Sequence, residues 1–365
     1  MDSDPHNQPA IITGPADALT DVEGLLVGHY TDLRAASGVT AVIAPKGAVG
    51  AVDVRGAAPG TRETDLLHPV NLVDRVQAVV LSGGSVYGLA ATDGVVRWLA
   101  DKGWGFPLEA GHVAPIVPAA VLYDLGRGVD FIPPIGPDWG RAACDAAVAA
   151  AEPVLGCVGA GTGARCGDLK GGLGTASQVL PGGISVSALA AVNAYGSVVD
   201  PASGGLWEAR AALDTEFASL SRKRVVLPAP SLQDGAPPQA DASPQGGANT
   251  TLAVVATDAL LDKAQALKVA QMAHDGLARA IRPAHTMFDG DTIFCLSTGL
   301  NSLPATPGFF SGATARALSE VGQAAADCLV RAILKGVLAA TSMAGLTAFA
   351  DLPSRSTADD GGGAP

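Results

Sequence analysis

The sequence predicts an α/β protein whose strands and helices are stacked in layers. Two observations carry this prediction. Short runs rich in Val, Ala and Ile recur along the chain and are typical of buried strands, whereas longer Ala- and Leu-rich segments have helical composition. Hydrophobic residues make up 48% of the 365 residues and charged residues 16%, which is enough for a large core. Strands clustered between helical segments favour a layered arrangement.

The first half of the chain begins with a leader and continues with strands. Residues 1–20 are expected to form a flexible leader. Residues 24–54 hold short apolar runs divided by Gly and Pro, which predicts strands in hairpins. The run AVVLSGG at 78–84 predicts a buried strand that leads into a helix ending near Ala100. Residues 139–152 again have helical composition.

The second half alternates strands with helices around one break in composition. In the segment 228–249, Pro, Gly and polar residues dominate and no apolar period is present, so an exposed linker loop is expected. Buried strands are predicted within 183–200, 251–258 and 292–299. Helices are predicted at 207–222, 259–281 and 312–348, followed by a disordered tail that ends in DDGGGAP. No internal repeat is present.

Charge and cysteine content argue against several classes of protein. The net charge is −12 and no basic stripe is present, so nucleic acid is not an expected partner. The five cysteines form no CxxC pair, which favours small buried hydrophobes in a reducing compartment over disulfides or a zinc site. The N-terminus has no signal-peptide pattern, and the longest apolar runs are broken by Gly. A cytoplasmic protein without a membrane partner is expected.

Familiar cofactor and catalytic motifs do not match. The block GAGTGARCGDLKGGLG at 159–174 is neither a dinucleotide fingerprint nor a P-loop. It predicts either a set of tight turns or a backbone that closely approaches a ligand or catalytic group. SGGSVYG at 82–88 resembles a nucleophile elbow but has Tyr87 where the second Gly belongs. None of the six histidines has metal-ligand spacing, and no metal or organic cofactor is expected.

The sequence Asn249-Thr250-Thr251 lies where the linker meets a predicted strand. A Thr at the head of a buried strand, after a loose loop, is the arrangement of an N-terminal nucleophile. If the Asn249–Thr250 bond is cut, Thr250 gains an α-amino group with a pKa of roughly 7.7–8.0. That amine can take the proton from the Thr250 hydroxyl without a histidine. Spacing alone does not decide between this interpretation and an ordinary strand start.

Five separated blocks, in this order, resemble the DmpA-like L-aminopeptidase/D-esterase family. They are DVRGAAPGTRETDLL, LSGGSVYGLAATDGV, GAGTGARCGDLKGGLG, ANTTLAVVATDA and MFDGDT. That family consists of self-processing N-terminal-nucleophile hydrolases, among them β-peptidyl aminopeptidases and the nylon-oligomer (6-aminohexanoate-oligomer) hydrolase. The resemblance implies a four-layer α/β/β/α sandwich. It also implies one hydrolase domain, residues 21–350, self-cleaved into an α chain 1–249 and a β chain 250–365.

The resemblance assigns roles to individual residues. Thr250 matches the nucleophile, and Asn249 matches the residue whose carbonyl it attacks during self-cleavage. Asn193 matches the side chain that donates a hydrogen bond to the oxyanion, and Tyr123 matches a tyrosine near the nucleophile.

The acidic and basic positions are assigned in the same way. FDGDT by itself predicts a turn, but Asp289 and Asp291 match the paired acids of the nylon-hydrolase branch, which orient the nucleophile. The β-aminopeptidase branch has Ser and Glu there, so β-peptide specificity is not implied. The family lysine falls on Lys170 or, with another threading of the glycine turn, on Asp168.

The expected function is that of an autoprocessing aminopeptidase that releases N-terminal residues from short peptides, amides or esters. Family members form homo-oligomers, so a tetramer of αβ units is expected. One alternative is endo-type hydrolysis of 6-aminohexanoate oligomers, which the paired aspartates favour. Another is acyl transfer as in ornithine acetyltransferases, which share the Thr self-cleavage. A third is a non-enzymatic scaffold with the same fold.

Overall fold

The computed structural model describes residues 12–149, 152–211, 218–227, 249–306 and 311–355. The expected linker, apart from Asn249, lies outside these described residues, as do the disordered tail from residue 356 and the first part of the leader. Within the described part, residues 19–21 form a short turn of 3₁₀ helix, so the end of the expected leader is ordered.

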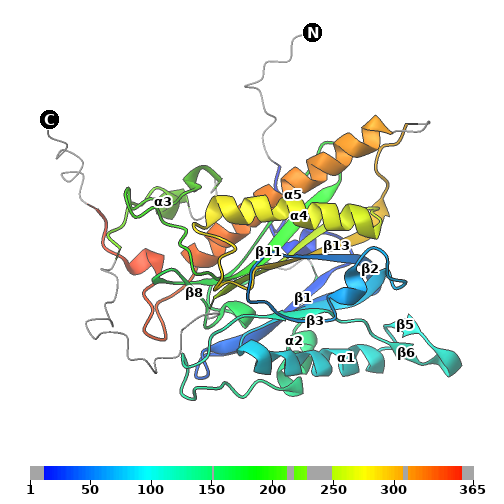
Figure 1. Ribbon diagram of the computed structural model, residues 1–365, viewed down its shortest axis with the longest axis horizontal. Coiled ribbons are helices and arrows are strands. Elements are labelled where there is room, and N and C mark those ends of the chain that lie inside the picture. The colour runs from blue at the N-terminus through cyan, green and yellow to red at the C-terminus, as the bar shows by residue number, and fades with distance from the viewer. Residues whose placement is uncertain (1–11, 150–151, 212–217, 228–248, 307–310, 356–365) are drawn as a thin grey trace, which may run out of the picture.

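Helices cover both outer faces of the molecule (Figure 1). The helices α4 (Lys263–Ala280) and α5 (Gly312–Leu338) lie on one face. On the other face lie α1 (Ala91–Asp101) and α2 (Pro137–Asp145). Two layers of strands separate the two helix pairs. The four-layer α/β/β/α sandwich is therefore confirmed.

The strands form one hydrogen-bonded sheet folded over into two layers. The order is β10-β11-β12-β13-β2-β4-β7-β3, and β1 also pairs with β2. The layer under α4 and α5 contains β10 (Gly172–Val179), β11 (Ser185–Asn193), β12 (Thr250–Ala259) and β13 (Thr292–Asn301). The layer next to α1 and α2 contains β1 (Leu26–Asp32), β3 (Gly60–Arg62), β4 (Arg75–Ser82) and β7 (Ala119–Val121).

Strand β2 (Ser37–Val54) belongs to both layers. Its first part pairs with β1 and β4, and its last part pairs with β13. The pairing of β2 with β4 shifts register between Ile43 and Ala48 and ends at Val49, where the pairing with β13 begins. Pro45 and Gly47 fall in this interval. The Gly and Pro that were expected to divide short strands instead mark an irregularity in one long strand. The expected hairpin is present as the antiparallel pair β1–β2.

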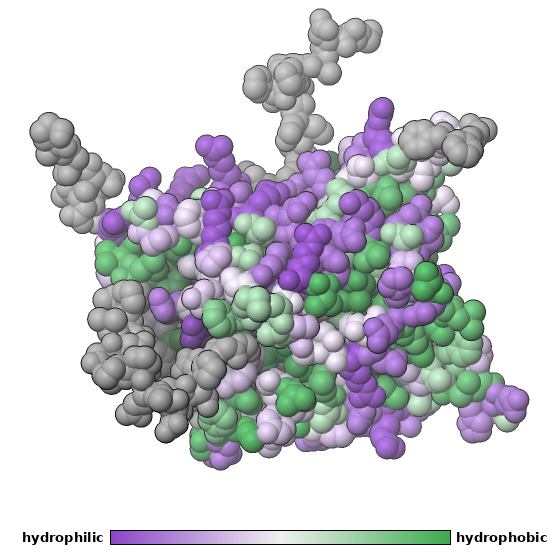
Figure 2. Space-filling model, viewed as in Figure 1, coloured by the Kyte–Doolittle hydropathy of each residue, from purple (hydrophilic) through white to green (hydrophobic). Residues whose placement is uncertain are grey.

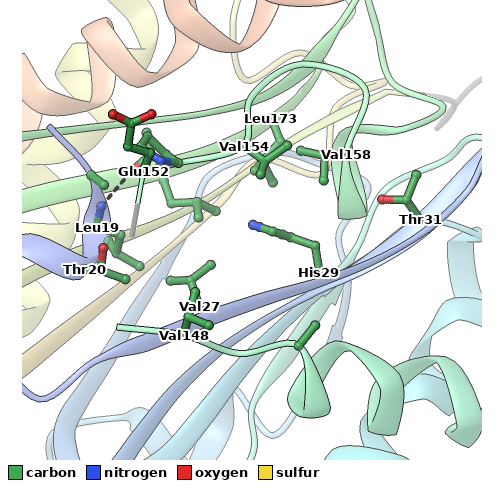
Figure 3. A pocket seen from close by; sticks show the side chains of 15 residues that line it. Leu19, Thr20, Val27, His29, Thr31, Val148, Glu152, Val154, Val158 and Leu173 are labelled. Carbon is green, nitrogen blue, oxygen red and sulfur yellow. Dashed lines mark hydrogen bonds between the residues drawn. The ribbon is translucent and has the colours of Figure 1, made fainter. Parts of the chain in front are cut away.

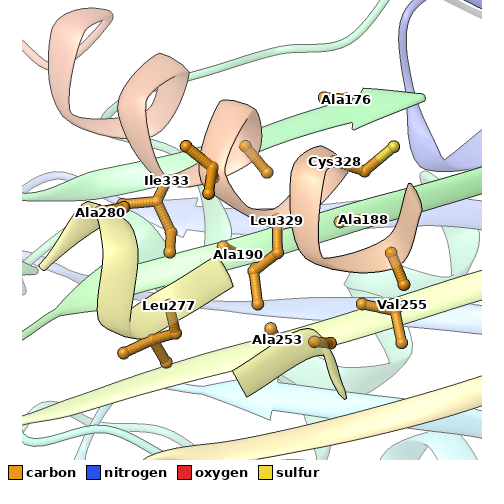
Figure 4. Packing of buried hydrophobic residues seen from close by; sticks show 14 of the residues in the cluster. Ala176, Ala188, Ala190, Ala253, Val255, Leu277, Ala280, Cys328, Leu329 and Ile333 are labelled. Carbon is orange, nitrogen blue, oxygen red and sulfur yellow. The ribbon is translucent and has the colours of Figure 1, made fainter. Parts of the chain in front are cut away.

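Three hydrophobic clusters hold the four layers together. Figure 4 shows the first, in which Leu277 of α4 and Leu329 and Ile333 of α5 pack on small residues of the strands below, such as Ala190 and Ala253. The second cluster lies between the two strand layers, and the third lies under α1 and α2. Alternate residues of β12 face the first and second clusters, because successive side chains of a strand point to opposite faces. β12 is therefore buried on both sides.

Two helices end earlier than their composition predicts. α2 ends at Asp145 because Val148 leaves the helix and exchanges backbone hydrogen bonds of 3.0 and 3.1 Å with Val27 of β1. α5 ends at Leu338, ten residues before the predicted end. Ala344 and Gly345 have φ of 53° and 75°, in the left-handed region, which a continuing α-helix excludes.

The described residues bear out only part of the helix predicted at 207–222. A 3₁₀ turn at Ala209–Ala211 and the four-residue α3 (Ala218–Ser221) are present, and residues 212–217 lie outside the described part.

The strand that begins at Thr250, β12, lies inside the sheet. β12 and its parallel neighbour β13 have strands from earlier in the chain, β11 and β2, on either side. β12 pairs antiparallel with β11, and β13 pairs antiparallel with β2. β12, α4 and β13 together form a parallel β-α-β unit. Figure 2 shows hydrophilic residues over α4 and α5, the solvent side of that unit. Among the described helices, none is long and apolar enough to cross a membrane.

Candidate active site

Three strand ends meet at one edge of the α4/α5-side layer. Asn193, the last residue of β11, is the register partner of Thr250, the first residue of β12. β12 and β13 run parallel, so the residues just before both strands lie at the same edge. This brings Asp289 and Asp291 beside the start of β12, and Asn249 forms a backbone bridge with Asp289.

Thr250 is 3% exposed, and its hydroxyl contacts the carbonyl oxygen of the residue before it, Asn249. The backbone N–H of Gly290 donates to Thr250 Oγ1 at 3.2 Å and to the Asn249 carbonyl oxygen at 3.1 Å. A Cβ on residue 290 would lie 2.8 Å from Thr250 Oγ1. Glycine at 290 therefore lets the backbone approach both oxygens.

The two aspartates are buried and fully engaged with nearby donors. Asp289 accepts from the N–H of Tyr195 at 3.0 Å and from the N–H and hydroxyl of Thr286 at 3.1 and 2.5 Å. Asp291 accepts from the N–H of Thr251 at 2.8 Å, the residue after the candidate nucleophile. Burial, and then the negative charge of Asp291, raise the pKa of Asp289.

Two histidines, His285 and His274, are linked to Asp291: His285 contacts its carboxylate, and His274 contacts the ring of His285. His285 donates to the second carboxylate oxygen of Asp291 through its N–H at 3.0 Å, and its Nδ1 lies 2.8 Å from the same oxygen. Its ring meets that of His274 edge to face, with centroids 4.8 Å apart. His274 Nε2 lies 3.0 Å from the backbone oxygen of Asp53. Burial lowers the pKa of His274 to about 4, so this ring is neutral at neutral pH.

The side chain of Asn193 is fixed from both ends. Its Oδ1 accepts from Arg127 Nη1 at 2.7 Å and from the N–H of Arg165 at 3.0 Å. Its Nδ2 donates to the carbonyl oxygen of Tyr123 at 3.1 Å. Because two N–H donors face one atom of the amide, that atom is the oxygen and the other is the nitrogen. The amide NH₂ is therefore turned away from the arginine.

Arg127 links this amide to the glycine-rich block, since its Nη1 also donates to the carbonyl of Gly163. Burial lowers the pKa of Arg127 to about 10, and Asp124 opposes this, so the guanidinium remains charged at neutral pH. Asp124 itself accepts from Ser37 Oγ at 2.7 Å and from the N–H of Gly84 at 2.6 Å. The backbone of the glycine-rich block approaches a candidate catalytic group at Arg165, whose N–H donates to Asn193.

Lys170 is completely buried, and its ammonium lies among backbone carbonyls of the same block. Nζ donates to Gly171 at 2.8 Å, Ala164 at 2.9 Å and Gly161 at 3.2 Å. Burial lowers the pKa of Lys170 to about 8. These contacts join Lys170 to the turn that carries Gly163 and Arg165, not to Thr250. Within the described residues, no cluster of His, Cys, Asp and Glu is suited to hold a metal ion.

The geometry can be compared with known proteins. A model of peptidase family S58 matches residues 17–349.

The chain belongs to peptidase family S58.

This S58 peptidase is 48% identical to an uncharacterized aminopeptidase of Mycobacterium tuberculosis, over 92% of this chain and 98% of the relative. It is 30% identical to the 6-aminohexanoate-oligomer endohydrolase of Kocuria sp., over 90% and 88% of the two chains. A Burkholderia sp. beta-aminopeptidase has a similar fold, with a TM-score of 0.66 at 23% identity over 93% and 91% of the chains. The L-aminopeptidase D-Ala-esterase/amidase of Ochrobactrum anthropi gives a TM-score of 0.65 at 22% identity, over 92% and 90%.

These relations confirm the family resemblance, and they make the S58 protein an enzyme of the peptidase/hydrolase class. Sequence reasoning missed several residues of this candidate site. They are Arg127, Tyr195, His285, Thr286 and Gly290. His285, Thr286 and Gly290 stand within six residues of Asp291, so their nearness to FDGDT was a usable signal. Arg127, in a loop between two glycines, offered none.

Proposed function

We propose that this S58 peptidase cuts its own Asn249–Thr250 bond and then hydrolyses amides with Thr250 as an N-terminal nucleophile. One observation carries the proposal: the Thr250 hydroxyl lies against the carbonyl of Asn249, with the Gly290 N–H on both oxygens. A nucleophile, its target and a donor for the developing negative charge are thus together in the uncut chain.

In the proposed self-cleavage, Thr250 Oγ1 attacks the carbonyl carbon of Asn249. The negative charge develops on the Asn249 oxygen, which already accepts from the Gly290 N–H. The C–N bond then breaks, the hydroxyl proton passes to the departing nitrogen, and an ester joins the two residues. Water hydrolyses this ester, which leaves a carboxylate on Asn249 and restores the Thr250 hydroxyl beside a free α-amine.

The free amine is the base for later turnovers, because its ordinary pKa of roughly 7.7–8.0 suits proton transfer near neutrality. Asp291, through Thr251 N–H, and Asp289, through its bridge to residue 249, fix the backbone on either side of Thr250. Asn193 is proposed as the donor to the substrate oxyanion, a role for which Arg127 orients its amide. Removing one such donor typically lowers transition-state stabilisation by about 2.7–4 kcal/mol.

Lys170 and Tyr123 are proposed to act in support of this site. Lys170 holds the carbonyls of Gly161 and Ala164 and so keeps the turn that reaches Asn193 in place. Tyr123 contributes its carbonyl oxygen as the acceptor that fixes Asn193 Nδ2. In these proposed roles, both residues would act through Asn193 and the glycine-rich turn.

The proposed substrates are short peptides, amides or esters that lose an N-terminal residue. Tyr195 and Phe288 lie next to the aspartate pair with ring centroids 5.2 Å apart, and both are exposed, as is Met287. This apolar surface suits an uncharged substrate side chain. Endo-hydrolysis of 6-aminohexanoate oligomers is the second candidate, favoured by Asp289 and Asp291 and by the 30% identical relative. A tetramer of αβ units is proposed from the family alone.

The test is denaturing electrophoresis with intact mass and N-terminal sequencing. The wild type is expected to give two fragments, the second beginning with Thr250. Thr250→Ala should stay uncut and inactive, whereas Thr250→Ser should still process. Thr251→Val is the matched control and should cleave normally. An uncut wild type that nonetheless hydrolyses amides would exclude the proposal.

Substrate class is tested on the purified wild type with aminoacyl p-nitroanilides, 6-aminohexanoate oligomers and N-acetylornithine. Release of the terminal residue from the anilides supports the aminopeptidase. Preferential cutting inside the oligoamides supports the nylon-type alternative. Acetyl transfer to an amine in place of hydrolysis would support the acetyltransferase alternative, and an uncut chain with no turnover on any of the three would favour the scaffold.

A further inference from the structure

An apolar cavity of ≈ 350 Å³ lies where β1, β10 and the turn at residues 19–21 meet (Figure 3). Leu189 of β11 forms part of its inner wall and precedes Asn193 by four residues. At the rise of a strand, four residues span about 13 Å. None of the proposed catalytic residues lines the cavity. It is therefore separate from the site around Thr250.

The walls of the cavity are mainly aliphatic. Its apolar lining includes Val27, Val148, Val154, Val158, Leu173 and Leu189. The volume falls at the lower end of the range of about 300–1,000 Å³ for small-molecule sites, which are typically apolar with a few placed polar groups. Val154 and Glu152 in the cavity wall are exposed, so the cavity is open to solvent and a ligand can enter it.

His29 supplies a placed polar group. Figure 3 shows its ring between Val27 and Leu173, with a ring nitrogen at the far end directed into the cavity. The other ring nitrogen, Nδ1, lies 3.0 Å from Thr40 Oγ1.

Thr40 fixes the tautomer of His29. Thr40 Oγ1 accepts from the N–H of Ala160 at 3.1 Å, and its own hydroxyl hydrogen is buried. Among the described contacts, His29 Nδ1 at 3.0 Å is the acceptor within reach of that hydrogen, so donation from Thr40 to Nδ1 is the arrangement that satisfies both groups. A neutral imidazole that accepts at Nδ1 carries its proton on Nε2. The cavity is thus presented with one N–H donor.

The charge around the cavity excludes anions. Burial among apolar groups lowers the pKa of His29 to about 4, so the ring is neutral at neutral pH. No Lys or Arg is among the described residues that line the cavity, and Glu152 is exposed at its mouth. A carboxylate ligand would find no cation and would face Glu152. An uncharged ligand meets neither difficulty.

We infer that this cavity is a second binding site, for a neutral, largely aliphatic molecule that carries one carbonyl acceptor for His29 Nε2–H. The carbonyl would lie against the imidazole, and the alkyl part would fill the space between Val27 and Leu173. The inference is independent of the reaction proposed at Thr250, since no residue is shared.

The probe is 2-heptanone, a ketone that an amide hydrolase does not cleave, and heptanoate is its anionic counterpart. Binding to the full-length protein is measured by titration with ¹³C-methyl NMR of Val and Leu. The ketone is expected to shift the methyl signals of Val27, Val154 and Leu173. Heptanoate is expected to bind at least about tenfold more weakly, because its charge is unpaired in the cavity.

Two variants test the residues. Val154 is 60% exposed, so Val154→Phe can obstruct the mouth without disturbing the core, and it should abolish the shifts. Val70→Phe, at a position 82% exposed and outside the cavity, is the matched control and should bind normally. His29→Leu should weaken ketone binding by about tenfold, the value of one hydrogen bond, and leave toluene binding unchanged.

Three results would overturn the inference: shifts confined to methyls outside the cavity or no shifts at all, equal affinity for heptanoate, or undiminished binding by Val154→Phe. If Val154→Phe instead changes the oligomeric state seen by gel filtration, the cavity mouth is an interface between copies and not a ligand site. If the His29→Leu protein folds, its ketone affinity tests the hydrogen bond from His29. If it does not fold, the comparison of Val154→Phe with Val70→Phe still tests whether the cavity binds the ketone.

Discussion

Thr250 carries an ordinary hydroxyl, which is a weak nucleophile at neutral pH. Its surroundings supply what the residue lacks. Gly290 brings an N–H to both the hydroxyl and the carbonyl it faces, and Asp291 holds the next residue through Thr251 N–H. The contact from Gly290 is made by its backbone and that from Asp291 by its carboxylate, so the site depends both on the path of the chain at 290 and on the acid at 291.

His285 is a positioning residue for Asp291. His285→Ala is expected to lower kcat by about tenfold to a hundredfold with a smaller change in KM, because hydrogen bonds to charged groups contribute about 1.5–3 kcal/mol. His285 has φ of 55°, a conformation that Asn also tolerates. His285→Asn should therefore restore part of the rate, by steady-state kinetics on an aminoacyl anilide.

His68→Ala, at an exposed histidine far from this network, serves as the control and should leave kcat unchanged. An undiminished kcat in His285→Ala would show that Asp291 does not need the imidazole.

The sequence indicates part of this site and not the rest, for a physical reason. Thr250, Asp289 and Asp291 stand in short local patterns, and a family resemblance gave those patterns their meaning. Arg127 and Asn193 are 66 residues apart and meet only because β11 and the loop after β7 end at the same edge. The residues around Arg127 in the sequence do not indicate its contact with Asn193. The ammonium of Lys170 donates to carbonyls of its own glycine-rich turn, and its link to the reaction stays a prediction.

At the scale of elements, apolar strands were the most predictable feature. The strands predicted at 78–84, 251–258 and 292–299 are present as β4, β12 and β13 with small shifts of their ends. Helix ends were less predictable, because Ala-rich composition continues past the residue where tertiary contacts take over. At the end of α2, the bridge between Val148 and Val27 determines the end, and that bridge is a long-range contact.

The close contact of α4 with α5 depends on Gly276. A Cβ at this position would lie 2.2 Å from the carbonyl oxygen of Ala326 in α5. Gly276→Ala should therefore lower the free energy of unfolding by about 1–3 kcal/mol, although Ala is the better helix former. Urea unfolding measures the change. Gly205→Ala is the control, since its nearest atom would be 3.5 Å away and its stability should hardly change. Equal stability of the two variants would contradict the packing argument.

For the whole molecule, stability should decrease in acid. Burial lowers the pKa of His29 and of His274 to about 4, below the ordinary value of 6.5. Between pH 6.5 and 4 the unfolded chain binds more protons than the folded one, so stability falls as the pH falls through this window. Each histidine contributes a slope of at most about 1.4 kcal/mol per pH unit.

The raised pKa values of buried Asp124 and Asp289 act in the opposite direction, since they favour the folded state as the pH falls. The histidine contribution is therefore measured by comparing how the unfolding free energy of variants and wild type changes with pH. His29→Leu should flatten the dependence of unfolding free energy on pH between 6.5 and 4, by urea titration at several pH values. His68→Leu, at the exposed position, should keep the wild-type slope. Parallel curves for wild type and His29→Leu would be the contrary result.

The proposed cut should not separate the two fragments. β12 would remain paired with β11 and β13 with β2, so two strand pairs would cross between the fragments. The first hydrophobic cluster also draws residues from both sides of the cut. The fragments should co-elute in native gel filtration and part only in denaturant, together with the loss of circular dichroism. Separation under native conditions would contradict this arrangement.

The strand β2, shared by both layers, has a further consequence for motion. The backbone of β2 is hydrogen-bonded to β1 and β4 in its first part and to β13 in its last part. Neither strand layer can therefore unfold locally while the other stays folded. The amide hydrogens of Val42 in one layer and Ala51 in the other should then show the same free energy of opening in deuterium exchange, equal to that of global unfolding.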